Sequence, residues 1–196
     1  ILIAVFLGAG LLADAFFVAF RIPNTFRRLF SEGTFNAAFV PSYSSLLNNK
    51  KKSQKFANNI FTLLVIGLFF LVLIIEIMMP LFVFLIAPGF EGDYQKMELA
   101  ITLTRITFPF LMFISLASFF SAILNSHNKF AIASAAPIIL NILLIGVLLF
   151  GKVLNDQLVY YLSYAVTISG LLQFIFLYFF VKKHFSPKIN LSFKID

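Results

Sequence analysis

Residues 60–75 read IFTLLVIGLFFLVLII, an unbroken stretch without a charged side chain. Similar apolar stretches occupy residues 81–88, 138–150 and 170–181. A helix needs roughly 20 predominantly apolar residues to cross about 30 Å of hydrocarbon. The stretches do not alternate apolar with polar residues, as the strands of a membrane barrel would. They therefore predict an all-α integral membrane protein, a polytopic helix bundle.

The composition also indicates a membrane protein. Of the 196 residues, 61% are hydrophobic and 12% are charged, whereas soluble domains carry about 25% charged residues. The sequence has no cysteine, which excludes disulfides and thiolate metal sites, and its two histidines, His127 and His184, lie in polar connectors. It shows no Gly-rich phosphate loop, no paired metal ligands and no histidine beside a nucleophile. We therefore expect neither an enzyme nor a cofactor nor a metal site.

We predict a partial first helix and five further membrane helices in one N-terminal lobe covering residues 1–196. The first apolar stretch, Ile1–Leu7, is too short to cross a bilayer, so we expect the chain to be a fragment that begins inside a helix. The second segment, Leu11–Leu47, contains Pro23, Gly33 and Pro41. It should therefore span the membrane up to about Gly33, with a kink near Pro23. Pro109 and Pro137 predict kinks in the fourth and fifth helices. The predicted segments are Ile1–Leu7, Leu11–Leu47, Lys55–Ile86, Met97–Leu124, Ala131–Phe150 and Gln157–Val181.

The connectors differ in charge on the two sides of the predicted bundle. One side receives Lys50, Lys51, Lys52, Lys55, Lys129, Lys182, Lys183, Lys188 and Lys194. The other has only Lys96 and Lys152, together with Glu91, Asp93, Glu98 and Asp156. Lysine and arginine are retained in the cytoplasm, so the even-numbered helices run inward and the N-terminus is cytoplasmic. The net charge of +7 follows mainly from this asymmetry. It favours contact with membrane lipids and gives no support for nucleic-acid binding.

The second predicted helix carries the densest set of ionisable residues, namely Asp14, Arg21, Arg27, Arg28 and Glu32. Each such residue costs a few kcal/mol (roughly 2.5–3.5) at the centre of a membrane helix and needs a partner or a wet cavity. Asp14, Arg21 and Arg28 recur every seven residues and therefore share nearly one helix face. Glu32 follows Arg28 by four residues and can pair with it. Three arginines facing two acids predict an anion site.

Two interpretations of these arginines stay open on the sequence alone. In the first, they line a cavity and bind phosphate, which the planar guanidinium fork suits through bidentate hydrogen bonds. In the second, Arg27 and Arg28 extend to the cytoplasmic headgroups, because both lie in the inward half of the helix.

A series of short motifs carries a resemblance to a known family. The chain resembles the MurJ (MviN) lipid II flippases, and the resemblance covers essentially all of it, in order and with natural spacing. The motifs are ADAFFVAF at 13–20, IPN at 22–24, RRLFSEG at 27–33, FVP at 39–41, APGF at 87–90, ITFP at 106–109, ISLAS at 114–118, AILN at 122–125, AP at 136–137 and LN at 140–141.

The resemblance implies one lobe of a two-lobed exporter fold of the multidrug/oligosaccharidyl-lipid/polysaccharide (MOP) superfamily, with the C-terminal lobe absent here. It implies lipid II, an undecaprenyl-pyrophosphate-linked peptidoglycan precursor, as the substrate that crosses the bacterial inner membrane. By position, Arg27 matches the family's cavity arginine, Glu32 the glutamate that follows it, and Asp14 the aspartate near the outer end. Helix geometry instead places Arg28 in line with Asp14, so both arginines are retained as candidates.

These observations suggest a working hypothesis of alternating access. A cytoplasm-open cavity would bind the pyrophosphate through Arg27, with Arg28 and Arg21 as neighbouring cations. Asp14 would help to close the outer gate by pairing with a cation on another helix, and Glu32 would be a charge partner. A coupling ion is not identified by the sequence. The alternatives are a related MOP-type exporter of another polyprenyl-linked saccharide or of drugs, and a membrane scaffold that transports nothing.

Overall fold

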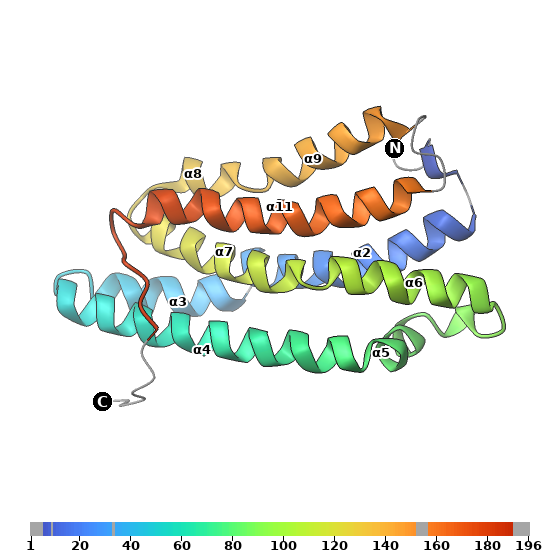
Figure 1. Ribbon diagram of the computed structural model, residues 1–196. Helices are drawn as coiled ribbons and strands as arrows, with labels where there is room; N and C mark the ends of the chain where they lie inside the picture. The colour runs from blue at the N-terminus through green and yellow to red at the C-terminus, as the bar shows by residue number, and fades with distance from the viewer. Residues whose placement is uncertain (1–5, 9, 33, 152–156, 190–196) are drawn as a thin grey trace.

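Long helices run side by side along one direction in the computed structural model (Figure 1). The structure describes residues 6–8, 10–32, 34–151 and 157–189. Within these ranges the regular elements are helices, which confirms the all-α prediction. They are α2 (Leu11–Glu32), α3 (Thr34–Ser45), α4 (Lys50–Ile77), α5 (Met79–Ile86), the 3₁₀ helix η1 (Pro88–Phe90), α6 (Tyr94–Thr107), α7 (Phe110–Ser126), α8 (Phe130–Ala135), α9 (Ile138–Leu149) and α11 (Leu158–Val181).

Four segments of the described chain are long and apolar enough to cross a membrane. They are Lys50–Ile77, Tyr94–Ser126, Phe130–Leu149 and Leu158–Val181. The helix α2 has 22 residues and is therefore about 33 Å long at 1.5 Å per residue, but it carries the charged residues. The predicted first helix, Ile1–Leu7, lies largely outside the described residues, and only Phe6 and Leu7 are seen as helix.

Proline divides two of the predicted spans. The fourth breaks into α6 and α7 around Pro109, and the fifth breaks into α8 and α9 around Pro137. Proline has no N–H and its ring clashes with the preceding turn, so the intrahelical hydrogen bonds stop at each site. By contrast, Pro23 lies inside α2, which continues through it. The second predicted segment separates into α2 and α3 around Gly33, a residue outside the described part.

The predicted third helix, Lys55–Ile86, was wrong at its start and in its continuity. The helix α4 begins at Lys50, because the side chain of Asn49 accepts a hydrogen bond from the backbone N–H of Lys52 at 3.2 Å and caps the first turn. It ends at Ile77, and Pro80 then lies in the first turn of α5, a position where its missing N–H costs little. The lysines taken as a connector are therefore the first turns of a helix.

The centre of the bundle is α7, which packs against α11, α2, α3, α4 and α8. In the most apolar 18-residue part of each span, 72% is buried for α6–α7 but only 17% for α4. Exposed side chains on α4 include Phe69, Phe70 and Ile74. A membrane protein is expected to expose such residues to lipid, so we assign α6–α7 to the core and the outer face of α4 to the hydrocarbon.

The lysines gather at one end of the bundle. The connections α3–α4 and α7–α8 and the end of α11 lie together there, while η1 and the start of α6 lie at the opposite end (Figure 1). Lys50, Lys129 and Lys182 therefore share an end, and Glu91 and Asp93 lie at the other. Lys152, Asp156 and Lys194 lie outside the described residues. The charge asymmetry read from the connectors is thus an asymmetry between the two ends of the folded chain.

Candidate functional site

One face of α2 is buried against the rest of the bundle. Ala15, Phe16 and Ala19 have no exposed surface, and α2 packs mainly against α6 and α7. The small alanine side chains let the α2 backbone approach its neighbours closely. One result is a hydrogen bond between helices, in which the hydroxyl of Thr107 donates to the carbonyl oxygen of Ala19 at 2.9 Å.

The opposite face of α2 carries the charges. Asp14, Arg21 and Arg28 are all exposed, as their seven-residue spacing predicted. Thr25 is exposed between the two arginines, and its hydroxyl donates to the carbonyl oxygen of Arg21 at 2.8 Å. We call Asp14, Arg21, Thr25 and Arg28 the α2 charged stripe. From Asp14 to Arg28 it extends about 21 Å along the helix axis at 1.5 Å per residue.

Two of the predicted site residues cannot be placed on this face from the structure. Arg27 and Glu32 belong to the α2 backbone, but their side chains lie outside the described part of the chain. The choice between Arg27, favoured by resemblance, and Arg28, favoured by helix geometry, is therefore a prediction still to be tested. The exposure of Arg28 shows that helix geometry placed this arginine on the same side as Asp14.

Asp14 pairs with a cation from another helix. The Lys96 Nζ lies 2.7 Å from the Asp14 Oδ2, although the two residues are 82 positions apart. Lys96 is fixed in the first turn of α6, where its backbone N–H donates to the capping carboxylate of Asp93 at 3.0 Å. Its Nζ also lies 5.0 Å from the centroid of the Phe90 ring, within the range of a cation–π contact. The Lys96 side chain is 22% exposed and that of Asp14 is 51% exposed.

Sequence reasoning did not single out Lys96, because it treated the residue only as a connector lysine. Two signals could have found it. It follows the helix-capping Asp93 by three residues, which predicts a fixed position in a first turn. It also lies on the same side of the predicted bundle as Asp14, where the charge pattern places only one other lysine, Lys152.

A second acid, Glu76 of α4, lies within electrostatic range of a base on α6, although its buried Oε1 has no hydrogen-bond partner among the described residues. The Arg105 guanidinium exerts an attractive electrostatic effect on the Glu76 carboxyl group. Glu76 is only partly exposed and lies in the last turn of α4, whereas Arg105 is exposed in the last turn of α6. Both residues belong to apolar spans, where an ionised side chain needs such a partner.

The geometry of the α2 charged stripe suits an anionic ligand. The one acid in the stripe, Asp14, pairs with Lys96, and the stripe also carries the guanidinium groups of Arg21 and Arg28. Guanidinium groups bind phosphate through paired hydrogen bonds. In the described residues no group of three or more His, Cys, Asp or Glu side chains could hold a metal ion.

Comparison with known proteins places the chain in a family. The family described as "Lipid II flippase MurJ" matches residues 3–195. A protein of Rhizobium tropici named "Probable lipid II flippase MurJ" is 40% identical over 198 residues, which cover 98% of this chain and 37% of that protein. A protein of Burkholderia cenocepacia named "Lipid II flippase MurJ" is 38% identical, with 89% of this chain and 34% of that protein covered.

A solved structure has the same fold. The structure described as "Lipid II flippase MurJ, inward closed conformation" superposes with a TM-score of 0.76 at 28% sequence identity and covers 96% of this chain and 40% of that chain. The present chain thus spans little more than a third of the length of the relatives it matches, 37% in the Rhizobium tropici protein. The family match extends over residues 3–195, which include all of α2, and the chain belongs to the MurJ family of lipid II flippases.

Proposed function

We propose that the full-length protein containing this chain is a lipid II flippase, which moves the polyprenyl-pyrophosphate-linked precursor from the cytoplasmic to the periplasmic leaflet of the bacterial inner membrane. The observation that carries this proposal is the exposed, net cationic face of α2 in a chain that is otherwise lipid-compatible. Its relatives bear the name of this activity. No covalent bond changes in the transfer, so the protein is a transporter and not an enzyme.

The pyrophosphate would bind at the inward half of α2. Arg27 and Arg28 lie there, and Arg21 lies two turns further along the helix from Arg28, about 10 Å at 1.5 Å per residue. A pyrophosphate carries several anionic oxygens, so more than one guanidinium group can engage it at once. The polyprenyl tail would stay in lipid, beside the apolar outer faces of the bundle. Glu32 would limit the excess positive charge when the cavity is empty.

Asp14 would act at the outer end of α2. Its pair with Lys96 is formed within this one chain, so it holds α2 against α6 and does not by itself join two lobes. The Asp14 side chain remains 51% exposed, which leaves the carboxylate accessible to a second cation from the remainder of the protein. Closure of the outer gate would then add one ion pair to a helix end that Lys96 has already positioned.

The orientation follows from the lysine-rich end of the bundle, which we assign to the cytoplasm. This assignment puts the Asp14–Lys96 pair on the periplasmic side and, because the partial first helix would then run outward, makes the N-terminus of the full-length protein cytoplasmic. A reporter fused after Val181 should therefore show a cytoplasmic location, and one placed in the η1–α6 connector should show a periplasmic one.

The proposal is tested by arginine substitution in the full-length protein, reconstituted in vesicles and assayed for lipid II translocation. Arg27→Ala and Arg28→Ala should each lower the translocation rate at least tenfold if one phosphate contact is lost, because hydrogen bonds to charged groups contribute about 1.5–3 kcal/mol. Arg27→Lys and Arg28→Lys keep the charge but lose the fork and should recover only part of the rate. Lys51→Ala, in the first turn of α4, is the control for a general loss of positive charge.

The result distinguishes the proposed cavity from its alternatives. If both alanine variants transport lipid II at the wild-type rate, the arginines extend to headgroups and the cavity mechanism is wrong. If wild-type protein fails to move lipid II but moves another polyprenyl-linked saccharide or a drug, the substrate is wrong while the exporter architecture stands.

A further inference from the structure

The carbonyl of Ala19, within α2, lacks the donor that a regular helix would give it. In an α-helix this carbonyl accepts a hydrogen bond from the N–H four residues later, but the residue at that position is Pro23, and proline has no N–H. Ala19 and Pro23 are both buried, and α2 continues through the proline. A buried carbonyl without a donor is costly, so this one needs a donor from outside its own helix.

Thr107 of α6 supplies that donor. Its hydroxyl lies 2.9 Å from the Ala19 carbonyl oxygen, and both residues are fully buried. The same hydroxyl lies 3.2 Å from the carbonyl oxygen of Thr104, but that carbonyl already accepts the backbone N–H of Phe108 at 2.8 Å. A hydroxyl has one hydrogen to donate. The Ala19 carbonyl is the nearer acceptor and the one that lacks a helical donor, so we assign the hydrogen of Thr107 to it.

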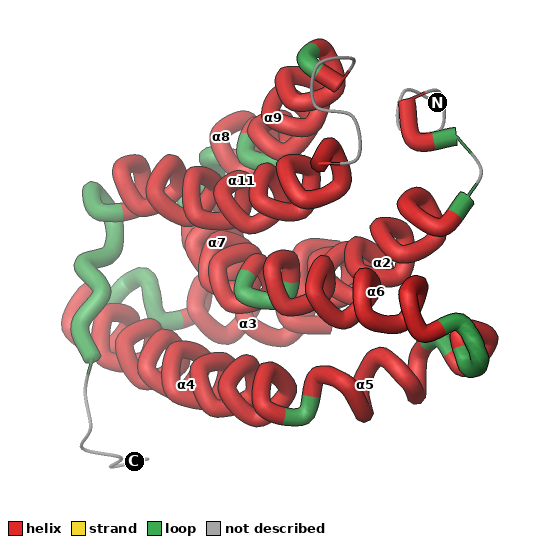
Figure 2. Tube along the Cα trace, turned by 45° about the vertical axis from the view of Figure 1, so that its right-hand side comes forward, coloured by secondary structure: helices red, strands yellow, loops and turns green. Residues whose placement is uncertain are grey.

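This bond is one of two that hold the first half of α2 against α6. The two helices lie side by side (Figure 2). Near the start of α6, Lys96 pairs with Asp14, and at the end of α6 its last residue, Thr107, bonds to Ala19. The second point lies one turn before Pro23. The part of α2 that precedes the proline is therefore fixed on α6 up to the turn in which the helical hydrogen bond is missing.

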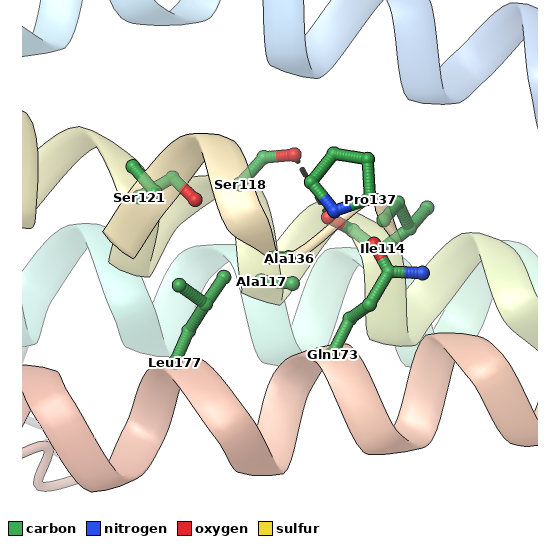
Figure 3. A pocket seen from close by; sticks show the side chains of 9 residues that line it. Ile114, Ala117, Ser118, Ser121, Ala136, Pro137, Gln173 and Leu177 are labelled. Atoms are coloured by element: carbon green, nitrogen blue, oxygen red, sulfur yellow. Dashed lines mark hydrogen bonds between the residues drawn. The ribbon is translucent and has the colours of Figure 1, made fainter. Parts of the chain in front are cut away.

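Close packing alone does not give every polar group of this bundle a partner. The Nε2 of Gln173 and the hydroxyl of Ser115 are buried, and neither has a hydrogen-bond partner among the described residues. Gln173 lies beside a small pocket lined by α7, α11 and the break between α8 and α9 (Figure 3). The bond from Thr107 to Ala19 is therefore a particular pairing. It joins the effect of the proline in the IPN motif at 22–24 to the threonine of the ITFP motif at 106–109.

We propose that Thr107 is a positioning residue for the arginines of α2, because its hydroxyl replaces the N–H that Pro23 lacks and fixes the direction of the helix beyond the proline. Helices change direction at proline, and Arg27 and Arg28 follow Pro23 in α2. Arg28 lies about 7.5 Å beyond Pro23 along the axis, so a change of about 10° in helix direction moves its backbone by about 1.3 Å. Hydrogen-bond lengths vary by only about 0.5 Å. Without the Thr107 hydroxyl both guanidinium groups remain, but they are no longer held where a pyrophosphate meets them.

The link between Thr107 and Pro23 is tested without transport, by thermal unfolding of the full-length protein in detergent. Thr107→Val keeps the side-chain shape but removes the hydroxyl, so it should lower Tm. Pro23→Ala restores an N–H to the Ala19 carbonyl, so Thr107→Val should lower Tm by less in that background. An equal loss in both backgrounds overturns the proposal. If Thr107→Val alone does not fold, Thr107→Ser and the double variant should both fold, and failure of either overturns it as well.

Thr104→Val is the matched control for this measurement. The Thr104 side chain is as fully buried as that of Thr107, but its hydroxyl donates to the Ala100 carbonyl oxygen of its own helix at 2.6 Å. Removing it leaves the contact between α6 and α2 intact, so Tm should fall less than in Thr107→Val. A loss at Thr104 as large as that at Thr107 would mean that Tm reports any buried hydroxyl of α6, and the proposal would be overturned.

The positioning role rests on the proposed function and is tested by lipid II translocation in vesicles, at a temperature where every variant is folded. Thr107→Val should raise the lipid II concentration that gives half the maximal rate roughly three- to tenfold, the factor for one lost hydrogen bond. Thr107→Ser keeps the hydroxyl and should restore the wild-type value, and Thr104→Val should not change it. A lower maximal rate at an unchanged half-maximal concentration overturns the role, because the arginines then bind as before. If the wild-type protein does not move lipid II, the role toward pyrophosphate fails with the proposed function, whereas the Tm comparison still decides whether Thr107 replaces the missing N–H.

Discussion

Replacing Gly170 with alanine should loosen the packing of α11 on α7. A Cβ at this position would lie 2.7 Å from the Cδ2 of Phe110 and 3.2 Å from the Cβ of Phe113. The Phe110 ring is fully buried and has no open space to turn into, and the Phe113 Cβ moves only with the α7 backbone. Overpacking of this kind costs about 1–3 kcal/mol, and the better helix propensity of alanine offsets up to about 1 kcal/mol. The net loss of stability should be about 1–2 kcal/mol.

The assay is thermal unfolding of the full-length protein in detergent, followed by far-ultraviolet circular dichroism. A loss of about 1–2 kcal/mol lowers Tm by about 2–8 °C for a domain of this chain's size and by less in the longer full-length protein. Gly67→Ala in α4 and Gly146→Ala in α9 are matched controls, because a Cβ at either position has no heavy atom within 4 Å. They should leave Tm unchanged or raise it. If Gly170→Ala unfolds at or above the wild-type temperature, α11 and α7 do not pack as closely as described and the reasoning is refuted.

Two further predictions concern the two ends of the bundle. The His127 ring stacks on that of His184 with centroids 4.2 Å apart, and the Tyr43 hydroxyl lies 3.5 Å from His127 Nε2. Burial, and secondly the charge of His184, lower the pKa of His127 below its usual 6.5. On acidification the unfolded chain then binds more protons than the folded one, so the free energy of unfolding should have its full value above pH 6.5 and fall as the pH drops below it. The His127→Gln variant should show a weaker pH dependence in a series of thermal-unfolding measurements. A wild-type stability that rises on acidification would contradict the prediction. At the other end, a double-mutant cycle of Asp14→Asn and Lys96→Met should give a coupling of about 0.5 kcal/mol, since Asp14 is 51% exposed and screened by solvent. That coupling should shrink as salt is added, and a salt-independent value would mean that the pair is shielded from solvent.

The positions of the helices could be predicted because the signals are local. Apolar stretches marked the spans, and the breaks at Pro109 and Pro137 follow from the missing proline N–H alone. Helix starts were less reliable. Lys50 was assigned to a connector because it is charged, whereas the structure places it in the first turn of α4. The signal for that start is the capping side chain of Asn49, which makes a single hydrogen bond to the backbone N–H of Lys52.

The charged face of α2 was predictable for a related reason. A period of seven residues returns to nearly the same helix face, so the shared exposure of Asp14, Arg21 and Arg28 follows from spacing. The partner of Asp14 did not follow, because 82 residues separate it from Lys96 and only the packing of α2 on α6 brings them together. The stacking of His127 on His184 was missed in the same way. Both histidines were placed correctly in connectors, but nothing local indicates that these connectors meet.

The free-energy cost of placing charged side chains in hydrocarbon indicates what surrounds the charged face of α2. An arginine at the centre of a membrane helix costs roughly 2.5–3.5 kcal/mol on insertion scales, and Arg21 lies at the middle of the 22-residue α2, too far from either end to reach the headgroups easily. Asp14 and Arg28 lie closer to the ends and cost less. The face that bears all three must therefore meet water or protein and not hydrocarbon, although α4 and the outer face of α11 expose large apolar residues suited to lipid. A bundle with one charged face among apolar ones is what a lobe beside an aqueous cavity requires. The argument for such a cavity is strongest at Arg21, which the headgroup interpretation of Arg27 and Arg28 does not cover.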